Sequence, residues 1–477
     1  MYLISSSLNH LLNYQIAQKM YFHAIFFCGI LLAAIFTFAT TTTANTAVQQ
    51  VTPYKLGAES KRDLSAAAPS WHATFTPQQL QLHMGTSAEV LLELTDLPTE
   101  ASFEVLSENP HLASVEHLIP ADVISPITHT WRGNVTIDAL FLGSTKVYVR
   151  RVNSSERAEN TLGLTIIRRT RVIDYIFTGS VALLVSLLYI NFGAALDVTV
   201  LRGLLARPLA PIIGFLTQFI IMPLLGYGLG VLIFPDSPEL QLGLFFTGVS
   251  PSGGASNIWA VILGGNINLS VLMTTISNFA AFGMMPLWIF TLGQLIFNRA
   301  NITVPYENIA TFAVSLVVPL AIGLAIQRWS PRLTRVLVRL LKPISTCLIL
   351  FIIIFAIITN LYLFELFSWQ IIVAGLALPW AGYILAWCAA KALRRNSVDS
   401  LTIAIETGIQ NTGIAIFLLR FSLPQPEADL TTVIPVSVAI LTPIPLLGLY
   451  IYKRCAERGI KDGLPESQQA ITPTHRY

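Results

Sequence analysis

The chain has 477 residues, of which 53% are hydrophobic and only 12% are charged, where a soluble globular domain is about a quarter charged. This composition, with a mean hydropathy of +0.64, excludes an ordinary soluble protein and predicts a membrane protein. The net charge of +3, without a basic stripe interleaved with aromatic residues, gives no basis for nucleic-acid binding.

Residues 1–47 are typical of a signal peptide region. The apolar run AIFFCGILLAAIFTFAT (24–40) has Lys19 upstream and is followed by the small-residue stretch TTTANTA (41–47). We favour cleavage after this region because the apolar run is short for a membrane span and lacks a stop-transfer flank. The alternative is an uncleaved first helix that acts as a signal anchor.

Residues 48–170 are predicted to form a small β-sandwich-like domain outside the cytosol. Short runs in which apolar and polar residues alternate are separated by Gly, Pro, Asn and Ser, as strands are by turns. The runs are 88–94, 102–107, 133–141, 145–152 and 162–169. The segment contains no cysteine, so no disulfide is expected in it. Three Asn-X-Ser/Thr triplets that are expected outside the cytosol are glycosylation candidates or chance matches: Asn134, Asn153 and Asn301.

Residues 171–453 carry little charge and are predicted to form nine membrane-spanning helices. Apolar stretches of roughly 20 residues or more mark the spans. They are 173–197, 208–234, 240–264, 267–297, 305–327, 343–364, 369–390, 400–421 and 429–452. With 48–170 outside, the connections rich in Arg and Lys fall inside, as the positive-inside rule requires. The protein is then a multi-pass protein of the plasma membrane or an endomembrane, with 454–477 as a cytoplasmic tail.

Glu406 is the one acidic residue deep in a predicted span. An intramembrane carboxylate is costly and indicates a functional site by default, the alternative being a protonated structural residue. Gly408 and Gly413 predict a break in its helix, and PSGG (251–254) predicts a second break about 150 residues earlier. Two interrupted spans at such a distance favour a five-span inverted repeat whose broken helices cross at a transport site.

Neutral Ser, Thr, Asn and Gln oxygens around a single carboxylate suit a hard monovalent cation such as Na⁺. Three motifs surround this pattern: GVSPSGGASNIWAVILGGNINLSVLMTTISN (248–278), TQFIIMPLLG (217–226) and ETGIQNTG (406–413). Together they resemble the bile acid:sodium symporter family over roughly residues 173–453. The N-terminal domain resembles that of the P3-type branch of the family.

The resemblance implies two sodium sites and a substrate region. The first sodium site would use Ser256, Asn257, Ser270, Thr274 and Glu406. The second would use Gln218, Glu406, Thr407, Ile409 and Gln410. The substrate region would include Gly254, Asn411 and Thr412. Family members commonly read Cys-Pro-Gly-Gly followed by Asn or Thr, whereas this chain reads SPSGG (250–254). Gly254 thus replaces a polar residue that is expected to face the substrate, which leaves the substrate's identity open.

The resemblance implies a sodium-coupled symporter of an amphipathic organic anion, such as a bile acid or steroid conjugate, that works by alternating access. It implies no enzymatic activity and no organic cofactor, and no His lies between His129 and His475 to serve a hydrolase. A receptor or scaffold that binds a partner through residues 48–170 is the alternative. An ion channel is disfavoured because no repeated carboxylate ring is present.

Overall fold

The computed structural model describes residues 71–462 except 99–100, 116, 126, 170, 196–207, 301, 303 and 360–367. The predicted signal peptide region, the end of the tail beyond residue 462 and the glycosylation candidate Asn301 lie outside the described residues.

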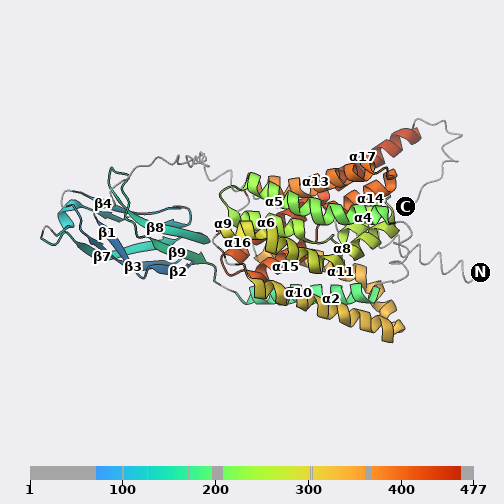
Figure 1. Cartoon of the computed structure of the whole chain (residues 1–477), viewed down its shortest axis with the longest axis horizontal. Coiled ribbons are helices and arrows are strands. Elements are labelled where there is room, and N and C mark those ends of the chain that lie inside the picture. The colour runs from blue at the N-terminus through green and yellow to red at the C-terminus, as the bar shows by residue number, and fades with distance from the viewer. Residues whose placement is uncertain are drawn as a thin grey trace, which may run out of the picture. The chain divides into compact units, whose positions relative to one another are not determined.

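Within the described residues, nine β-strands form two sheets (Figure 1). The strands are β1 (His72–Thr76), β2 (Gln79–His83), β3 (Ser87–Thr95), β4 (Phe103–Ser107), β5 (Ala113–Ser114), β6 (His117–Ile119), β7 (Trp131–Ala139), β8 (Gly143–Arg151) and β9 (Leu162–Ile167). One sheet has the order β1-β3-β7-β5 and the other has the order β2-β9-β8-β4-β6. Only the pair β2 and β9 is parallel, and the other described pairs are antiparallel.

The alternation of side chains sets the inner face of each sheet. Phe103 and Val105 of β4 are buried, as are Leu162 and Leu164 of β9, while the residues between them are more exposed. The buried residues of both sheets form one apolar cluster, in which the rings of Trp71 and Phe103 lie 4.8 Å apart. Each of the five runs that were predicted as strands overlaps a strand, whereas β1, β2, β5 and β6 were not predicted.

From Val172 onward the named elements of the described chain are helices (Figure 1). They are α2 (Val172–Ala195), α4 (Leu209–Leu216), α5 (Met222–Ile233), α6 (Pro238–Val249), α7 (Ala255–Ile262), α8 (Ile267–Trp288), α9 (Gln294–Ala300), α10 (Tyr306–Trp329), α11 (Pro331–Thr359), α13 (Trp369–Ala392), α14 (Ser397–Gly408), α15 (Thr412–Ser422), α16 (Glu427–Leu441) and α17 (Pro443–Asp462). Two π-helical turns, η2 (Thr217–Ile221) and η3 (Ile289–Gly293), interrupt this series, and a short 3₁₀ turn, η1 (Ala121–Val123), lies among the strands. Each of the nine predicted apolar stretches overlaps at least one of these helices.

Four continuous helical segments of the described chain are long and apolar enough to cross a membrane. They are Leu209–Ile233, Ile267–Ala300, Trp369–Ala392 and Glu427–Ala456. The chain is therefore a helical membrane-type protein that also carries a β-rich region before its helices.

The helices pack in two groups. In the first group α2, α10 and α11 contact one another, and α2 and α10 run side by side (Figure 1). Gly193 of α2 and Gly323 of α10 allow this approach, because a Cβ on either residue would meet backbone atoms of the other helix. In the second group α5 packs on α6, α6 packs on α16, and α13 packs on α14 and α16.

Candidate functional site

Two interrupted helices of the second group cross each other. Residues 250–254 separate α6 from α7, and residues 409–411 separate α14 from α15. The two linkers meet at an isolated antiparallel β-bridge, with Ser252 opposite Gln410. The N–H of Gly253 donates to the Ile409 oxygen at 2.8 Å, and the N–H of Asn411 donates to the Pro251 oxygen at 2.8 Å. The backbone groups that the breaks release are thus satisfied inside the protein, as an apolar environment demands.

Glycines allow the two linkers to come this close. A Cβ added to Gly253 would lie 2.7 Å from the carbonyl oxygen of Gln410, which is closer than real Cβ atoms approach such an atom. A Cβ on Gly408 would meet the ring of Tyr383. Both breaks occur where the sequence predicted them, and these glycines serve close packing there.

Glu406 lies in the last turn of α14, is 1% exposed and accepts hydrogen bonds from three hydroxyl groups. Ser252 and Thr274 donate to its Oε2 at 2.8 and 2.7 Å, and Ser270 donates to its Oε1. Asn257 supports these groups, because its Oδ1 lies 2.9 Å from Ser270 Oγ and its Nδ2 donates to Thr274 Oγ1 at 3.1 Å. The result is a compact set of oxygen atoms around one buried carboxylate.

The structure brings together the side chains predicted for the first sodium site. They come from α7, α8 and α14, and they are Ser256, Asn257, Ser270, Thr274 and Glu406. Ser256 is fully buried, and its Oγ lies 3.5 Å from Ser252 Oγ. Ser252 belonged to neither predicted ligand set, although its hydroxyl contacts the same carboxylate.

The residues predicted for the second sodium site also lie close together. Gln218 is 3% exposed, and its Nε2 donates to the Ser250 carbonyl and to Gln410 Oε1, each at 2.8 Å. Gln410 Nε2 in turn donates to the Thr407 carbonyl at 2.6 Å. The Oε1 atom of Gln218 is buried, and no donor among the described residues reaches it.

A proline explains the π-helical turn that contains Gln218. Pro223 has no N–H, so the Phe219 carbonyl lacks its usual partner four residues later. The indole N–H of Trp288 donates to that carbonyl at 2.7 Å and satisfies it. Such turns often mark functional positions in helices.

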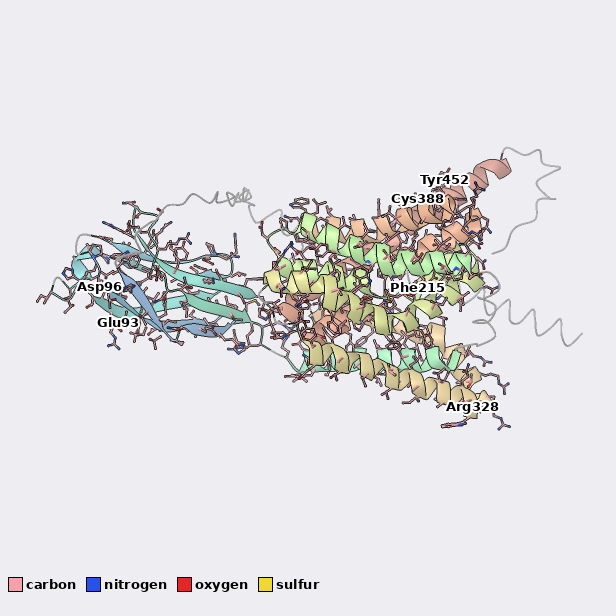
Figure 2. All side chains as sticks on the ribbon, viewed as in Figure 1. Glu93, Asp96, Phe215, Arg328, Cys388 and Tyr452 are labelled. Atoms are coloured by element: carbon pink, nitrogen blue, oxygen red, sulfur yellow. The ribbon has the colours of Figure 1, made fainter. Side chains whose placement is uncertain are left out.

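A small cavity lies beside these groups and is lined by Gln218, Ser252, Ser277 and Glu406. Phe215, which Figure 2 labels among the helices, forms part of its apolar wall. A buried acceptor without a donor is unfavourable, and a cation is one partner that satisfies it. Hard neutral oxygens with one carboxylate form a donor set that fits Na⁺.

The predicted substrate region lies where the linkers meet the following helices. Gly254 precedes α7, Asn411 precedes α15, and Thr412 is the first residue of α15; all three are partly exposed. Asn411 caps α15, because its Oδ1 accepts from the Ile414 N–H at 3.3 Å. The positive ends of two helix dipoles therefore flank this region, which suits a negatively charged group.

The two glycosylation candidates in the described chain are exposed. Asn134 lies in β7 and donates to Glu89 Oε2 at 3.0 Å, and Asn153 lies in the turn after β8. Their modification remains a prediction.

Comparisons with known proteins agree with the motifs. A family model described as the Sodium Bile acid symporter family matches residues 182–365. The P3 protein of Homo sapiens is 30% identical over 272 residues, which are 56% of this chain and 57% of that protein, so less than two thirds of its length is spanned. The ileal sodium/bile acid cotransporter of Homo sapiens is 30% identical over 305 residues, 62% of this chain and 86% of that protein. The sodium-dependent organic anion transporter of Bos taurus is 31% identical over 263 residues, 54% of this chain and 67% of that protein.

Proposed function

Because the chain belongs to the sodium bile acid symporter family, we propose that it is a sodium-coupled symporter of an amphipathic organic anion. The observation that carries this proposal is the set of oxygens around Glu406 at the crossing of two interrupted helices. Crossed, broken helices of this kind hold substrate and coupling ions in secondary transporters. The names of two relatives, a sodium/bile acid cotransporter and a sodium-dependent organic anion transporter, point to the same class of cargo.

The coupling ions are proposed to be two sodium ions that share Glu406. One would be held by Ser256, Asn257, Ser270, Thr274 and Glu406, and the other by Gln218, Glu406, Gln410 and the Thr407 and Ile409 carbonyls. Sodium neutralises the buried carboxylate and joins α7, α8 and α14, so its binding favours one arrangement of the helices over others.

The substrate is proposed to bind beside the crossing, at Gly254, Asn411 and Thr412. Among the residues that line the cavity next to Glu406 there is no Lys or Arg. The N-terminal ends of α7 and α15 would attract the anionic group instead. A bile acid or steroid conjugate matches this arrangement, because it joins one charged end to a large apolar body.

Transport is proposed to follow alternating access in a bundle of nine spans with five-span inverted-repeat character. The group of α2, α10 and α11 would rock against the group that holds Glu406. Residues 48–170 would lie outside the cytosol and the C-terminal tail inside, in the plasma membrane or an endomembrane. A receptor or scaffold would not require a buried carboxylate with three hydroxyl donors, so we do not favour that alternative.

The test is uptake of a taurine-conjugated bile acid into proteoliposomes that contain the full chain. We expect uptake under an inward sodium gradient and none under a potassium gradient of the same size. Glu406→Gln should abolish the sodium-driven component, while Glu307→Gln, at an exposed position in α10, should leave it unchanged. Equal uptake with both cations, or full uptake by Glu406→Gln, would contradict the proposal.

A further inference from the structure

Ser252 is held rigidly at the crossing of the two linkers. It is 2% exposed, and its backbone N–H donates to Ser277 Oγ at 2.9 Å. Its neighbours Pro251 and Gly253 are both hydrogen-bonded to the opposite linker. With the backbone fixed on both sides, the short side chain has little freedom, and its Oγ occupies a defined position.

The hydroxyl of Ser252 is used differently from three other buried serine hydroxyls near helix ends. Ser250 donates to the Phe246 carbonyl, Ser400 to the Asn396 carbonyl and Ser437 to the Ile434 carbonyl, each at 2.8 Å. These are ordinary bonds to a preceding turn. Ser252 instead donates across 154 positions to Glu406 Oε2 at 2.8 Å, as the predicted ligands Ser270 and Thr274 also do with the Glu406 carboxylate.

The position of Ser252 Oγ lies between the two predicted ligand sets. It is 3.5 Å from Ser256 Oγ, a member of the first set. Ser252 also lines the same cavity as Gln218, a member of the second set whose buried Oε1 has no donor among the residues that the structure describes. Where the family pattern described above places a glycine after the proline, this chain places a hydroxyl group beside the shared carboxylate.

We propose that Ser252 is a direct ligand of the coupling sodium and raises the sodium affinity and selectivity of this chain. This inference rests on the proposed function. When a cation enters, the hydroxyl turns its proton away from Glu406 and presents a lone pair to the ion. The same hydroxyl thus donates to the carboxylate without the ion and coordinates the ion when it is bound. The added oxygen increases the number of ligands, which matters more for Na⁺ than for the smaller Li⁺, since selectivity among hard cations depends on ligand number and cavity size.

The experiment is a titration of thermal unfolding of the purified full-length protein with Na⁺ and, separately, with Li⁺. The variants are Ser252→Ala, which removes only the oxygen, and Ser252→Thr, which keeps it. Ser437→Ala is the matched control, because it removes a fully buried serine hydroxyl that donates to a helix carbonyl. The measured quantity is the cation concentration at half of the maximal rise in melting temperature.

We expect Ser252→Ala to raise the sodium midpoint about tenfold, equivalent to about 1.4 kcal/mol of binding free energy, and to raise the lithium midpoint less. Ser252→Thr and Ser437→Ala should keep midpoints within about twofold of the original protein. A merely structural hydrogen bond would lower the melting temperature equally with and without sodium and would leave the midpoint unchanged.

An unchanged sodium midpoint in Ser252→Ala overturns the inference and leaves the proposed function intact, because the original protein still responds to sodium. If the original protein shows no sodium response, the proposed function fails and the inference fails with it. If Ser252→Ala does not yield folded protein, Ser252→Thr decides: a midpoint near that of the original protein supports the ligand role, and a tenfold increase contradicts it.

Discussion

Gln218 illustrates how a single side chain positions the site. Its Nε2 ties the linker after α6 to Gln410 on the other linker, while its Oε1 has no donor among the described residues. A buried oxygen without a donor is unfavourable, and a ligand or an ordered water molecule can satisfy it. Because the negatively charged carboxylate of Glu406 lines the same cavity, we expect the ligand of Gln218 Oε1 to be a cation.

Replacement of Gln218 by Ala should therefore weaken sodium binding by tenfold or more. The substitution removes the Oε1 ligand, and it also removes the two Nε2 hydrogen bonds to Ser250 and Gln410 that hold the linkers together. Gln241→Ala is the control. Gln241 is also a buried glutamine whose Oε1 has no donor among the described residues, but its Nε2 donates to the Phe234 carbonyl at 2.6 Å, away from the linkers. The sodium midpoint in a thermal-shift titration measures both variants, and equal midpoints for the two would argue against a role for Gln218 as a ligand.

At the residue scale, much of the candidate site follows from the sequence. A lone carboxylate in an apolar span marks Glu406, and the motifs around it point to its partners. Ser252 was missed because a serine in a Gly- and Pro-rich linker is also typical of a turn. Only the pairing of two linkers 154 positions apart shows that its hydroxyl reaches Glu406.

At the element scale, the crossing depends on close contact between two extended linkers. Gly253 packs against the Gln410 carbonyl, and a methyl group there would displace one linker from the other. Ile409 and Gln410 of the second predicted sodium site lie in one linker, and α7 and α14, which carry residues of the first site, begin or end at the linkers. A shift of either linker should therefore change stability and binding together.

Gly253→Ala should destabilise the protein by about 1–3 kcal/mol, the usual cost of overpacking a tight contact. Gly228→Ala is the control, because a Cβ at Gly228 in α5 meets no atom within 4 Å. Alanine is favourable in a helix by up to about 1 kcal/mol relative to glycine, so the control should be neutral or slightly stabilising. Melting temperatures test the pair, and a Gly253→Ala protein as stable as the control would contradict the close crossing.

The π-helical turn of η2 depends on a donor from another helix. Trp288→Phe removes the indole N–H that satisfies the Phe219 carbonyl, and the buried carbonyl should cost about 1–3 kcal/mol of stability. Trp380→Phe, at a 41% exposed position of α13, should change stability by no more than about 0.5 kcal/mol. Comparable melting temperatures for the two variants would show that Trp288 does not support the turn.

Sequence patterns predict the helices, strands and breaks of this protein only in part. The breaks near 251–254 and 409–411 were predicted, because Pro and Gly interrupt a helix locally. The π-helical turn was not predicted, and the Trp288 indole that satisfies its Phe219 carbonyl lies 69 positions away in the sequence. Among the strands that were missed, β5 and β6, with two and three residues, are too short to show a period. β1 and β2 were missed although their five residues alternate in burial.

At the scale of the whole molecule, the helices divide into a group of α2, α10 and α11 and a second group that holds the site. One polar bond between the groups runs from Asn308 Nδ2 of α10 to the Ser422 carbonyl at the end of α15, at 3.1 Å. If the groups move against each other during transport, such a contact must change.

A cross-link between the two groups should therefore stop transport without unfolding the protein. We would place cysteines at Asn308, which is exposed, and at Ser422, which is 1% exposed, in a background without the native cysteines, and join them directly as a disulfide. Sodium-driven uptake should fall to background after oxidation and return after reduction of the disulfide, which serves as the control. Full uptake by the cross-linked protein would contradict rocking of the two groups.

The central claim is that Glu406 and the oxygens around it bind sodium, and the thermal stability of the purified full-length protein tests it most directly. A ligand that binds only the folded state at a hundred times its Kd adds about 2.7 kcal/mol of stability. Sodium should raise the melting temperature by several degrees where an equal concentration of potassium does not, and Glu406→Gln should lose that rise while Glu307→Gln keeps it. No difference between sodium and potassium in the original protein, or an undiminished rise in Glu406→Gln, would contradict the account.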